Sequence, residues 1–363
     1  MKYILVIVFF VICGCSKLSN SYEISHVNHY KVFANDVKQT VEKIQIELLT
    51  EIFTDNIDAN RLLDPIWIDC SRDNIYILDK YDLTIKKYDF KGNYICKIGQ
   101  RGQGPGEYTS ARSFTIVNDS TIIVSDQERK IYPIFDTEGN FINNLNSDSF
   151  ITSIKKAKNG IVGNSFSFKN TQNGTYIITG VSYLDMYGTF KSIANKEFKL
   201  DDNFQEVNST ALFTANEKEI IISWKSSNSF SITAYDYQAD IGYIITKNYR
   251  EIQYTDSEIL EMKTLFPSLK LNNKKYSIRD IFSDYKQRIW VERSLDANTN
   301  SQSIVFDVFS EGIFYSNVIL PNNNRASDIL NIQKRIFLSN NYLFLIQQNN
   351  NNNQSVFVYR IID

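Results

Sequence analysis

The sequence contains two copies of one pattern, 47 residues apart and aligned without a gap. Residues 75–95 align with residues 122–142. The matched positions are Asp79 with Asp126, Tyr88 with Phe135, Asp89 with Asp136, Gly92 with Gly139, and Tyr94 with Phe141. A fixed period of this size indicates a repeat architecture, because each unit is one supersecondary element that buries its faces only against its neighbours.

Each repeat consists of short strands joined by polar turns. In the first copy, the pattern predicts strands at residues 66–68, 75–78, 84–89 and 94–98, with a hairpin turn at 91–93. Four antiparallel strands in a repeat of about 40 to 50 residues are typical of a propeller blade. The aligned Asp, Gly and aromatic positions form a landmark of the repeat. This landmark occurs again, in looser form, at residues 184–190, 235–236 and 306–314. These units predict five blades.

The two ends of the chain together predict a sixth blade. Residues 332–338, 342–347 and 355–361 give three strands, and the alternating segment 43–53 has no unit of its own. We expect this segment to pair with the last blade, because a closed ring removes the exposed strand edges of an open array. The sequence therefore predicts an all-β, six-bladed propeller over residues 39–363, with seven blades as the alternative and a helical insertion at about 255–267.

The composition agrees with a β protein and argues against one class of partner. Aromatic residues make up 13% of the 363 residues, which suits half-buried pleated surfaces. The sequence has 14 Gly residues, which is few for a β protein with many turns, since Gly usually makes up about 7% of a sequence. We therefore expect Asn and Asp to make most of the tight turns. The net charge is −2 with both signs interspersed, whereas nucleic-acid binding requires a basic stripe. We expect no nucleic-acid partner.

The first residues have the pattern of an export signal. Lys2 precedes an apolar stretch that is too short to span a bilayer, and small Gly14 precedes Cys15. Ile-Cys-Gly-Cys at residues 12–15 resembles a bacterial lipoprotein box. This resemblance implies removal of residues 1–14, lipidation of Cys15, a tether at residues 15–38 and attachment to the outer membrane, on either side of it. A plain secretory signal is the alternative.

We expect no disulfide between Cys70 and Cys96. An exported compartment permits one. However, Cys70 follows the first strand of its repeat and Cys96 lies in the fourth, so two strands, each about 4.8 Å from the next, should separate them. The polar run at residues 347–354 is expected to be a hairpin loop.

The most distinctive local sequence is the glycine-rich run at residues 99–108. It leaves a fourth strand and enters the next blade, so we expect it on the face of the ring where the central channel opens. Two interpretations are open. In the structural one, Glu107 and Tyr108 brace the junction between two blades. In the functional one, Arg101, Gln103, Glu107 and Tyr108 form the rim of a ligand site.

The remaining candidates are tryptophans and histidines. Trp67, Trp224 and Trp290 lie in apolar strands, where core packing is expected, but Trp67 or Trp290 at the channel mouth could stack on a sugar ring. His26 and His29 have a spacing that suits zinc but no third ligand, so no metal site or cofactor is predicted. The sequence has no nucleophile elbow, no Ser–His dyad in the repeats and no Walker pattern, so no catalytic residue is predicted.

Residues 73–79, 88–95 and 98–108 resemble the six-bladed β-propeller lipoproteins common in Bacteroidota, which are distant relatives of NHL-repeat propellers. The resemblance covers residues 62–145 most closely and implies an exported six-bladed ring without assigning a catalytic residue. We therefore expect a monomeric, lipid-anchored, non-catalytic module that binds a protein partner or a small glycan or peptide. The alternative is a lactonase-like or lyase-like enzyme with a divalent cation in its channel.

Overall fold

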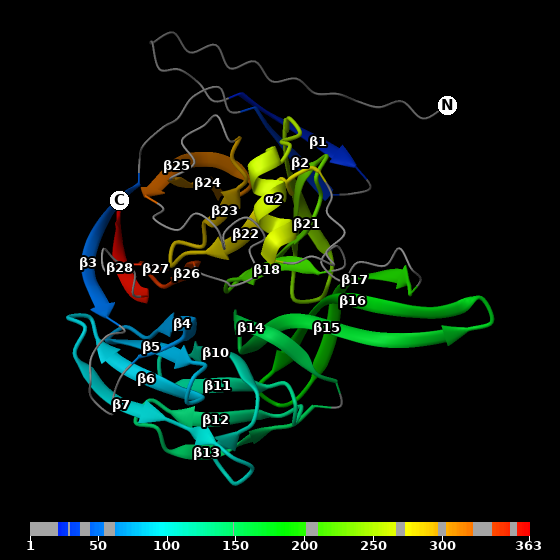
Figure 1. The fold of residues 1–363 in the computed structure, drawn as a ribbon. Helices are drawn as coiled ribbons and strands as arrows, with labels where there is room; N and C mark the ends of the chain where they lie inside the picture. Colours follow the sequence, from blue (N-terminus) through cyan, green and yellow to red (C-terminus); the bar gives the residue numbers. More distant parts are fainter. Residues whose placement is uncertain are drawn as a thin grey trace, which may run out of the picture.

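The chain folds into a ring of six four-stranded antiparallel blades (Figure 1). This computed structural model describes residues 21–27, 30–36, 44–53, 62–147, 149–200, 210–265, 273–296, 303–321, 336–348 and 354–363. Most of these residues lie in strands, and α2 (Asp256–Leu265) is the one helix among them. The predicted six-bladed propeller is confirmed, and the alternative of seven blades is wrong.

Blades 1 to 3 are built from consecutive strands, with the first strand of each innermost in the ring. Blade 1 contains β4 (Pro65–Cys70), β5 (Asn74–Asp79), β6 (Thr84–Asp89) and β7 (Tyr94–Ile98). Blade 2 contains β10 (Ala111–Val117), β11 (Thr121–Asp126), β12 (Tyr132–Asp136) and β13 (Phe141–Leu145). Blade 3 contains β14 (Ile151–Ala157), β15 (Gly160–Thr171), β16 (Gly174–Asp185) and β17 (Phe190–Lys199). The long β15–β16 hairpin extends beyond the body of the ring (Figure 1).

Blades 4 to 6 complete the circle. Blade 4 contains β18 (Ala211–Ala215), β19 (Ile220–Trp224), β20 (Phe230–Tyr235) and β21 (Ile241–Lys247). Blade 5 contains β22 (Ile278–Ser283), β23 (Ile289–Arg293), β24 (Ser303–Ser310) and β25 (Ile313–Pro321). Blade 6 contains β26 (Ile336–Ser339), β27 (Tyr342–Gln348), β28 (Gln354–Ile362) and β3 (Gln45–Phe53), which pairs antiparallel with β28. The predicted closure of the ring by the N-terminal strand is confirmed.

The Asp and Gly of the repeated landmark form the turn between the third and fourth strands. Asp89 accepts hydrogen bonds from the backbone N–H of Lys91 and Asn93 at 2.9 and 2.8 Å. Asp136, Asp185 and Asp236 accept the corresponding pair of bonds in blades 2, 3 and 4. Gly92 has a φ of 86°, a left-handed conformation that favours glycine. The strongest part of the repeat therefore specifies a turn.

The other repeated aspartate holds the entry to each blade. Asp79 and Asp126 are fully buried at the ends of the second strands. Asp79 accepts hydrogen bonds from the backbone N–H groups of Leu63 and Asp64, and Asp126 accepts them from those of Thr109 and Ser110. Each carboxylate thus fixes the chain just before the innermost strand.

Aromatic contacts cross the boundaries between blades and form part of the core. Trp67 of blade 1 packs edge-on against Phe337 of blade 6, with ring centres 5.5 Å apart. Phe230 of blade 4 lies 6.1 Å from Phe309 of blade 5. Burying such large apolar surfaces between sheets is the main stabilising contribution expected for this architecture.

The N-terminal hairpin corrects the prediction of an irregular tether. β1 (Ser21–Val27) pairs with β2 (Tyr30–Asp36), and β2 pairs in parallel with β21 at the outer edge of blade 4. The Asn35 side chain donates to the Gly312 carbonyl at 3.1 Å and accepts from the Phe314 N–H at 2.9 Å. Residues 21–25, Ser-Tyr-Glu-Ile-Ser, alternate polar and apolar residues, which suits strand pairing, and the hairpin covers an otherwise open sheet edge. Residues 1–20, with Cys15, lie outside the described residues.

Three smaller predictions concern the helix, the cysteines and the polar run. Thr255 and Glu258 form a capping box at the start of α2, each side chain accepting the other's backbone N–H, so the predicted helix is confirmed. Cys70 and Cys96 are both free, and β5 and β6 lie between their strands as predicted. Most of the polar run, residues 349–353, lies outside the described residues.

Candidate functional site

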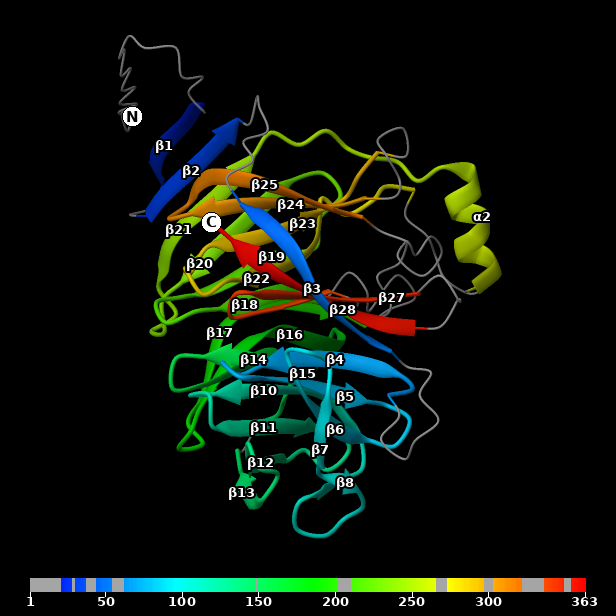
Figure 2. The same cartoon turned by 90° about the vertical axis from the view of Figure 1, so that its left-hand side faces the viewer.

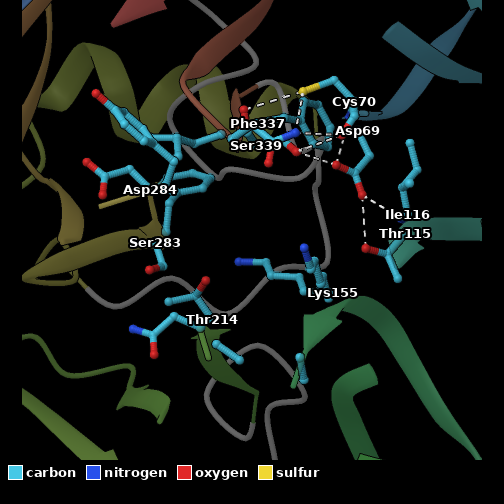
Figure 3. Close-up of a pocket in the computed structure, with 18 of the residues that line it drawn as sticks. Asp69, Cys70, Thr115, Ile116, Lys155, Thr214, Ser283, Asp284, Phe337 and Ser339 are labelled. Atoms are coloured by element: carbon cyan, nitrogen blue, oxygen red, sulfur yellow. Dashed lines mark hydrogen bonds between the residues drawn. The ribbon is translucent and has the colours of Figure 1, made fainter. Parts of the chain in front are cut away.

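A cavity of about 280 Å³ lies where the innermost strands of all six blades converge (Figure 3). Its walls come from the C-terminal parts of β4, β10, β14, β18, β22 and β26 and from the turns that follow them. The first strands of all blades run in the same direction along the ring axis, so these ends meet at one mouth of the channel.

The glycine-rich run at residues 99–108 lies away from this cavity. It contains β8 (Gln100–Arg101) and β9 (Glu107–Tyr108) and connects β7 to the start of β10, so it is on the face opposite the cavity mouth. Figure 2 shows β8 on the same side of the ring as α2. None of these residues lines the cavity. The run therefore does not share a face with this cavity, and a ligand rim formed by Arg101, Gln103, Glu107 and Tyr108 stays a prediction.

Tyr108 of this run braces the junction between blades 1 and 2, whereas the side-chain hydrogen bonds of Glu107 stay within the run. Tyr108 is fully buried, its hydroxyl donates to the Ile98 carbonyl at 3.1 Å, and its ring lies edge-on to Phe135. Glu107 accepts hydrogen bonds from the Gly104 N–H and from the Gln100 amide, which lower the pKa of the Glu107 carboxyl. Arg101 and Gln103 are exposed on the same loop.

The three tryptophans have different environments. Trp67 lines the cavity, but it is largely buried, with 8% of its surface exposed. Trp290 is fully buried, donates its indole N–H to Asp284 at 2.8 Å and packs against Phe306, so the proposal that it stacks on a sugar is wrong. Trp224 is half-buried, with the Lys196 ammonium 4.6 Å from its ring centre.

On one side of the cavity, the carboxylate of Asp69 links three blades (Figure 3). Asp69, at the end of β4, accepts hydrogen bonds from the Thr115 hydroxyl and the Ile116 N–H of blade 2, both at 2.9 Å. It also accepts from the Ser339 hydroxyl of blade 6 and from the N–H of Cys70. Burial raises the pKa of the Asp69 carboxyl, although these four hydrogen bonds oppose that effect. We call this set the Asp69 junction.

On another side, the ammonium of Lys155 links the other three blades. Lys155, in β14, donates to the carbonyl of Phe213 in blade 4 at 2.6 Å and to that of Ile281 in blade 5 at 3.0 Å. Asp280 lies 3.9 Å away, and the rings of Phe213 and Phe282 lie 5.3 and 5.2 Å from the ammonium. We call this set the Lys155 junction. Both junctions use charged groups to hold the innermost strands together around the cavity.

Blade 5 presents two polar atoms that the protein leaves unpaired. The Ser283 Oγ and Gln287 Oε1 atoms are buried, and neither has a hydrogen-bond partner among the described residues. Both residues line the cavity, from the end of β22 and the turn that follows it. Buried polar atoms are almost always hydrogen-bonded in native proteins, so these two are candidates for contact with a ligand.

The site residues predicted from the sequence do not include Asp69, Lys155, Ser283 or Gln287. One signal was available for the first two, because a charged residue inside a short apolar strand must be paired when the strand is buried. Asp69 follows Ile-Trp-Ile, and Lys155 follows an isoleucine in a predicted blade. Ser283 and Gln287 have no such signal, since serine and glutamine are ordinary turn-flanking residues.

The geometry of the described residues offers no metal site. Among the described residues, no group of three or more His, Cys, Asp and Glu side chains could hold a metal ion. His29 lies outside the described residues. The alternative enzyme with a cation in its channel therefore has no candidate ligand set in this part of the chain.

The ring of six four-stranded blades around a central channel defines a six-bladed β-propeller. Residues 57–258, more than half of the chain, match the family DUF5128, described as a 6-bladed beta-propeller. The chain belongs to this family, and the predicted kinship with Bacteroidota-type propellers is confirmed. No curated protein matches the sequence.

Two of the solved structures with the same fold come from Bacteroides species. A Bacteroides fragilis protein described as exported shares 12% identity, with a TM-score of 0.53 over 92% of this chain and 99% of its own. A DUF4221 family member from Bacteroides vulgatus also shares 12% identity, with a TM-score of 0.53 over 88% of this chain and 99% of its own. Virginiamycin B lyase from Staphylococcus aureus, at 10% identity and a TM-score of 0.43 over 88% and 100%, is too distant to carry an argument about activity.

The described residues contain no membrane-crossing helix. Within them, no helix is long and apolar enough to span a bilayer.

Proposed function

We propose that this protein is an exported, non-catalytic binding module that holds a small polar ligand in the cavity at the channel mouth. The observation that supports this proposal best is the convergence of all six innermost strands on one cavity. Among the described residues, Ser283 and Gln287 in its wall each have a buried polar atom without a hydrogen-bond partner. Concave sites with a few convergent polar groups are the usual form of small-molecule sites. A rigid ring held by two charged junctions pre-organises such a site and so reduces the entropy lost on binding.

The proposal includes attachment to the outer membrane through a lipid on Cys15. The lipoprotein-box pattern at residues 12–15 and the Bacteroides protein described as exported support this location. The protein acts as a monomer in this proposal, because ring closure within one chain already pairs the edge of β28.

A thermal-shift panel on residues 21–363 tests the binding function. The panel contains neutral sugars, sugar acids, amino acids, peptides and divalent cations. We expect one class to raise the melting temperature of the wild type and to have no effect on Ala215→Trp, which places an indole in the cavity wall. A shift that persists in the Trp variant would place the site elsewhere. If no class produces a shift, the proposed small-molecule site is wrong, and a protein partner becomes the next candidate.

A further inference from the structure

The turn between β22 and β23 differs from its counterparts in the other blades. Gln287 has a φ of 63°, the left-handed conformation that costs energy for most side chains. In the corresponding turns of blades 2, 3 and 6, the left-handed residues are Asn118 and Asp119, Asn159, and Asn340. Asparagine tolerates this conformation better than glutamine does. Blade 5 therefore carries a longer side chain where the turn itself favours a shorter one.

Asp284 fixes the position of this turn. One carboxylate oxygen accepts from the backbone N–H of Lys286 and Arg288 at 3.0 and 2.9 Å. The other accepts from the Arg288 guanidinium at 2.6 Å and from the Trp290 indole. The backbone N–H of Gln287 donates to the Asp284 carbonyl at 2.9 Å. These hydrogen bonds hold the backbone of the turn, which carries Ser283 and Gln287.

The charged side chains in the cavity wall are occupied by the protein itself. Asp69 receives four hydrogen bonds, Lys155 donates to two carbonyls beside Asp280, and Asp284 is paired with Arg288. Asp119, Glu217 and Lys156 are exposed at the mouth, where solvent screens charges of both signs. The buried atoms left to contact a ligand are therefore neutral.

An aromatic side chain stands at the mouth beside these atoms. Tyr285 lines the cavity and is 48% exposed. Its hydroxyl donates to Asp363 at 3.3 Å, and the Lys286 ammonium lies 5.6 Å from the ring centre, so the ring is held in place. An exposed aromatic surface next to neutral hydrogen-bonding groups suits a sugar ring, which has apolar faces and hydroxyl edges.

We infer that the ligand is a neutral saccharide whose hydroxyl groups hydrogen-bond to Ser283 Oγ and Gln287 Oε1 and whose ring packs on Tyr285. This inference rests on the proposed binding function and specifies its ligand class. A cavity of 280 Å³ is just below the roughly 300–1,000 Å³ typical of small-molecule sites, which limits the buried part of the ligand to one or two sugar rings. Gln287 Oε1 accepts a hydrogen bond from the ligand, and Ser283 Oγ either donates or accepts one.

The test combines ligand binding with the stability of the ligand-free protein. Binding of neutral hexoses, N-acetylhexosamines and their disaccharides to residues 21–363 is measured by calorimetry, with glucuronate and glucosamine as charged controls. We expect a neutral sugar to bind and Ser283→Ala or Gln287→Asn to weaken it about tenfold. Because neither atom has a hydrogen-bond partner within the described part of the free protein, the melting temperature without ligand should stay the same or rise in both variants.

Ser223→Ala is the matched control. Ser223 is also buried, but its hydroxyl donates to the Ser231 carbonyl at 2.9 Å and lies outside the cavity. This variant should lower the melting temperature and leave sugar affinity unchanged. If Ser283→Ala lowers the melting temperature as much as Ser223→Ala, or leaves sugar affinity unchanged, the assigned contact is wrong. If only a charged or peptide ligand binds in the cavity, the saccharide inference fails and the binding function stands. If nothing binds, the function itself fails.

Discussion

The carboxylate of Asp69 accepts a hydrogen bond from the hydroxyl of Ser339, which lies 270 residues further along the chain. This contact joins the first and last blades of the ring at the wall of the cavity. The same carboxylate binds blade 2, while Lys155 joins blades 3, 4 and 5. The two charged residues thus connect the innermost strands in two groups of three, and they fix the shape of the cavity.

Replacing Asp69 should destabilise the ring. In Asp69→Asn, an NH2 group replaces one carboxylate oxygen and cannot accept hydrogen bonds, so two of the four donors lose their acceptor. We expect the free energy of unfolding to fall by about 1–3 kcal/mol, measured by urea denaturation. Asp73→Ala, a change of an exposed carboxylate in the adjacent turn, should change it by less than about 0.5 kcal/mol.

The stability gap between wild type and Asp69→Asn should depend on pH. Burial raises the pKa of Asp69, so the folded protein binds this proton more tightly than the unfolded chain does. The resulting stabilisation is complete below about pH 3.9, the ordinary value for aspartate, and is lost as the pH rises through the folded-state pKa. Urea denaturation from pH 3.5 to 8 should show the gap narrowing with pH and then levelling. A gap that widens with rising pH would contradict this assignment.

The Lys155 junction should be energetically separate from the Asp69 junction. Lys155→Met keeps the aliphatic length but leaves two buried carbonyls and Asp280 without the ammonium, and should cost about 2–4 kcal/mol. None of the contacts described above belongs to both junctions, so the double variant should show the sum of the single effects within about 0.5 kcal/mol. A larger deviation in urea denaturation would show that the blade groups do not behave independently.

The repeated turn aspartates predict matched effects 47 residues apart. Asp89→Ala and Asp136→Ala each remove three hydrogen bonds from equivalent hairpin turns and should each cost about 1–2 kcal/mol at pH 7. The bonds from Asn93 and Asn140 lower the pKa of these carboxyls. The loss of folding free energy in each variant should therefore be present above about pH 3.9 and should diminish as the pH falls through the folded-state pKa. Clearly unequal costs would argue against equivalent turns.

The glycine-rich run should affect stability and leave ligand binding unchanged. Tyr108→Phe removes one buried hydrogen bond and should cost about 1 kcal/mol, whereas Tyr108→Ala also opens a cavity and should cost about 3–5 kcal/mol. Arg101→Ala, on the same loop, should change stability little. A Tyr108→Phe protein that is as stable as the wild type yet loses ligand affinity would restore this run as a ligand site.

Lipidation should depend on Cys15. In cells grown with an alkyne-tagged fatty acid, the full chain should incorporate the tag, Cys15→Ser should not, and Cys13→Ser should retain it. Labelling of the Cys15→Ser protein, or no labelling of the wild type, would favour the plain secretory signal instead.

The repeat made the fold predictable, and the physical reason is visible in particular residues. Asp89, Gly92 and their copies specify a turn, and Asp79 and Asp126 fix the entry to each blade. These interactions are local or separated by a constant number of residues, so they leave a periodic pattern in the sequence. The N-terminal hairpin has no repeat and pairs with a strand more than 200 residues away, and the sequence analysis missed it.

The candidate site was predictable only in part, because it is assembled from one strand end of each blade. Trp67 was recognised as a possible cavity residue, whereas Trp290 could not be distinguished from it by sequence alone. Asp69 and Lys155 occupy different places in their blades' patterns, and their partners lie in neighbouring blades. Contacts of this kind become apparent only when the ring is closed.

Hydrogen exchange with and without the sugar that binds most tightly shows directly whether the ligand occupies the cavity. We predict slower amide exchange around Ser283 to Arg288 and around Thr214 to Glu217, at the cavity mouth, with no change at residues 99–108 on the opposite face. Protection at residues 99–108 without protection in the turn between β22 and β23 would contradict the account.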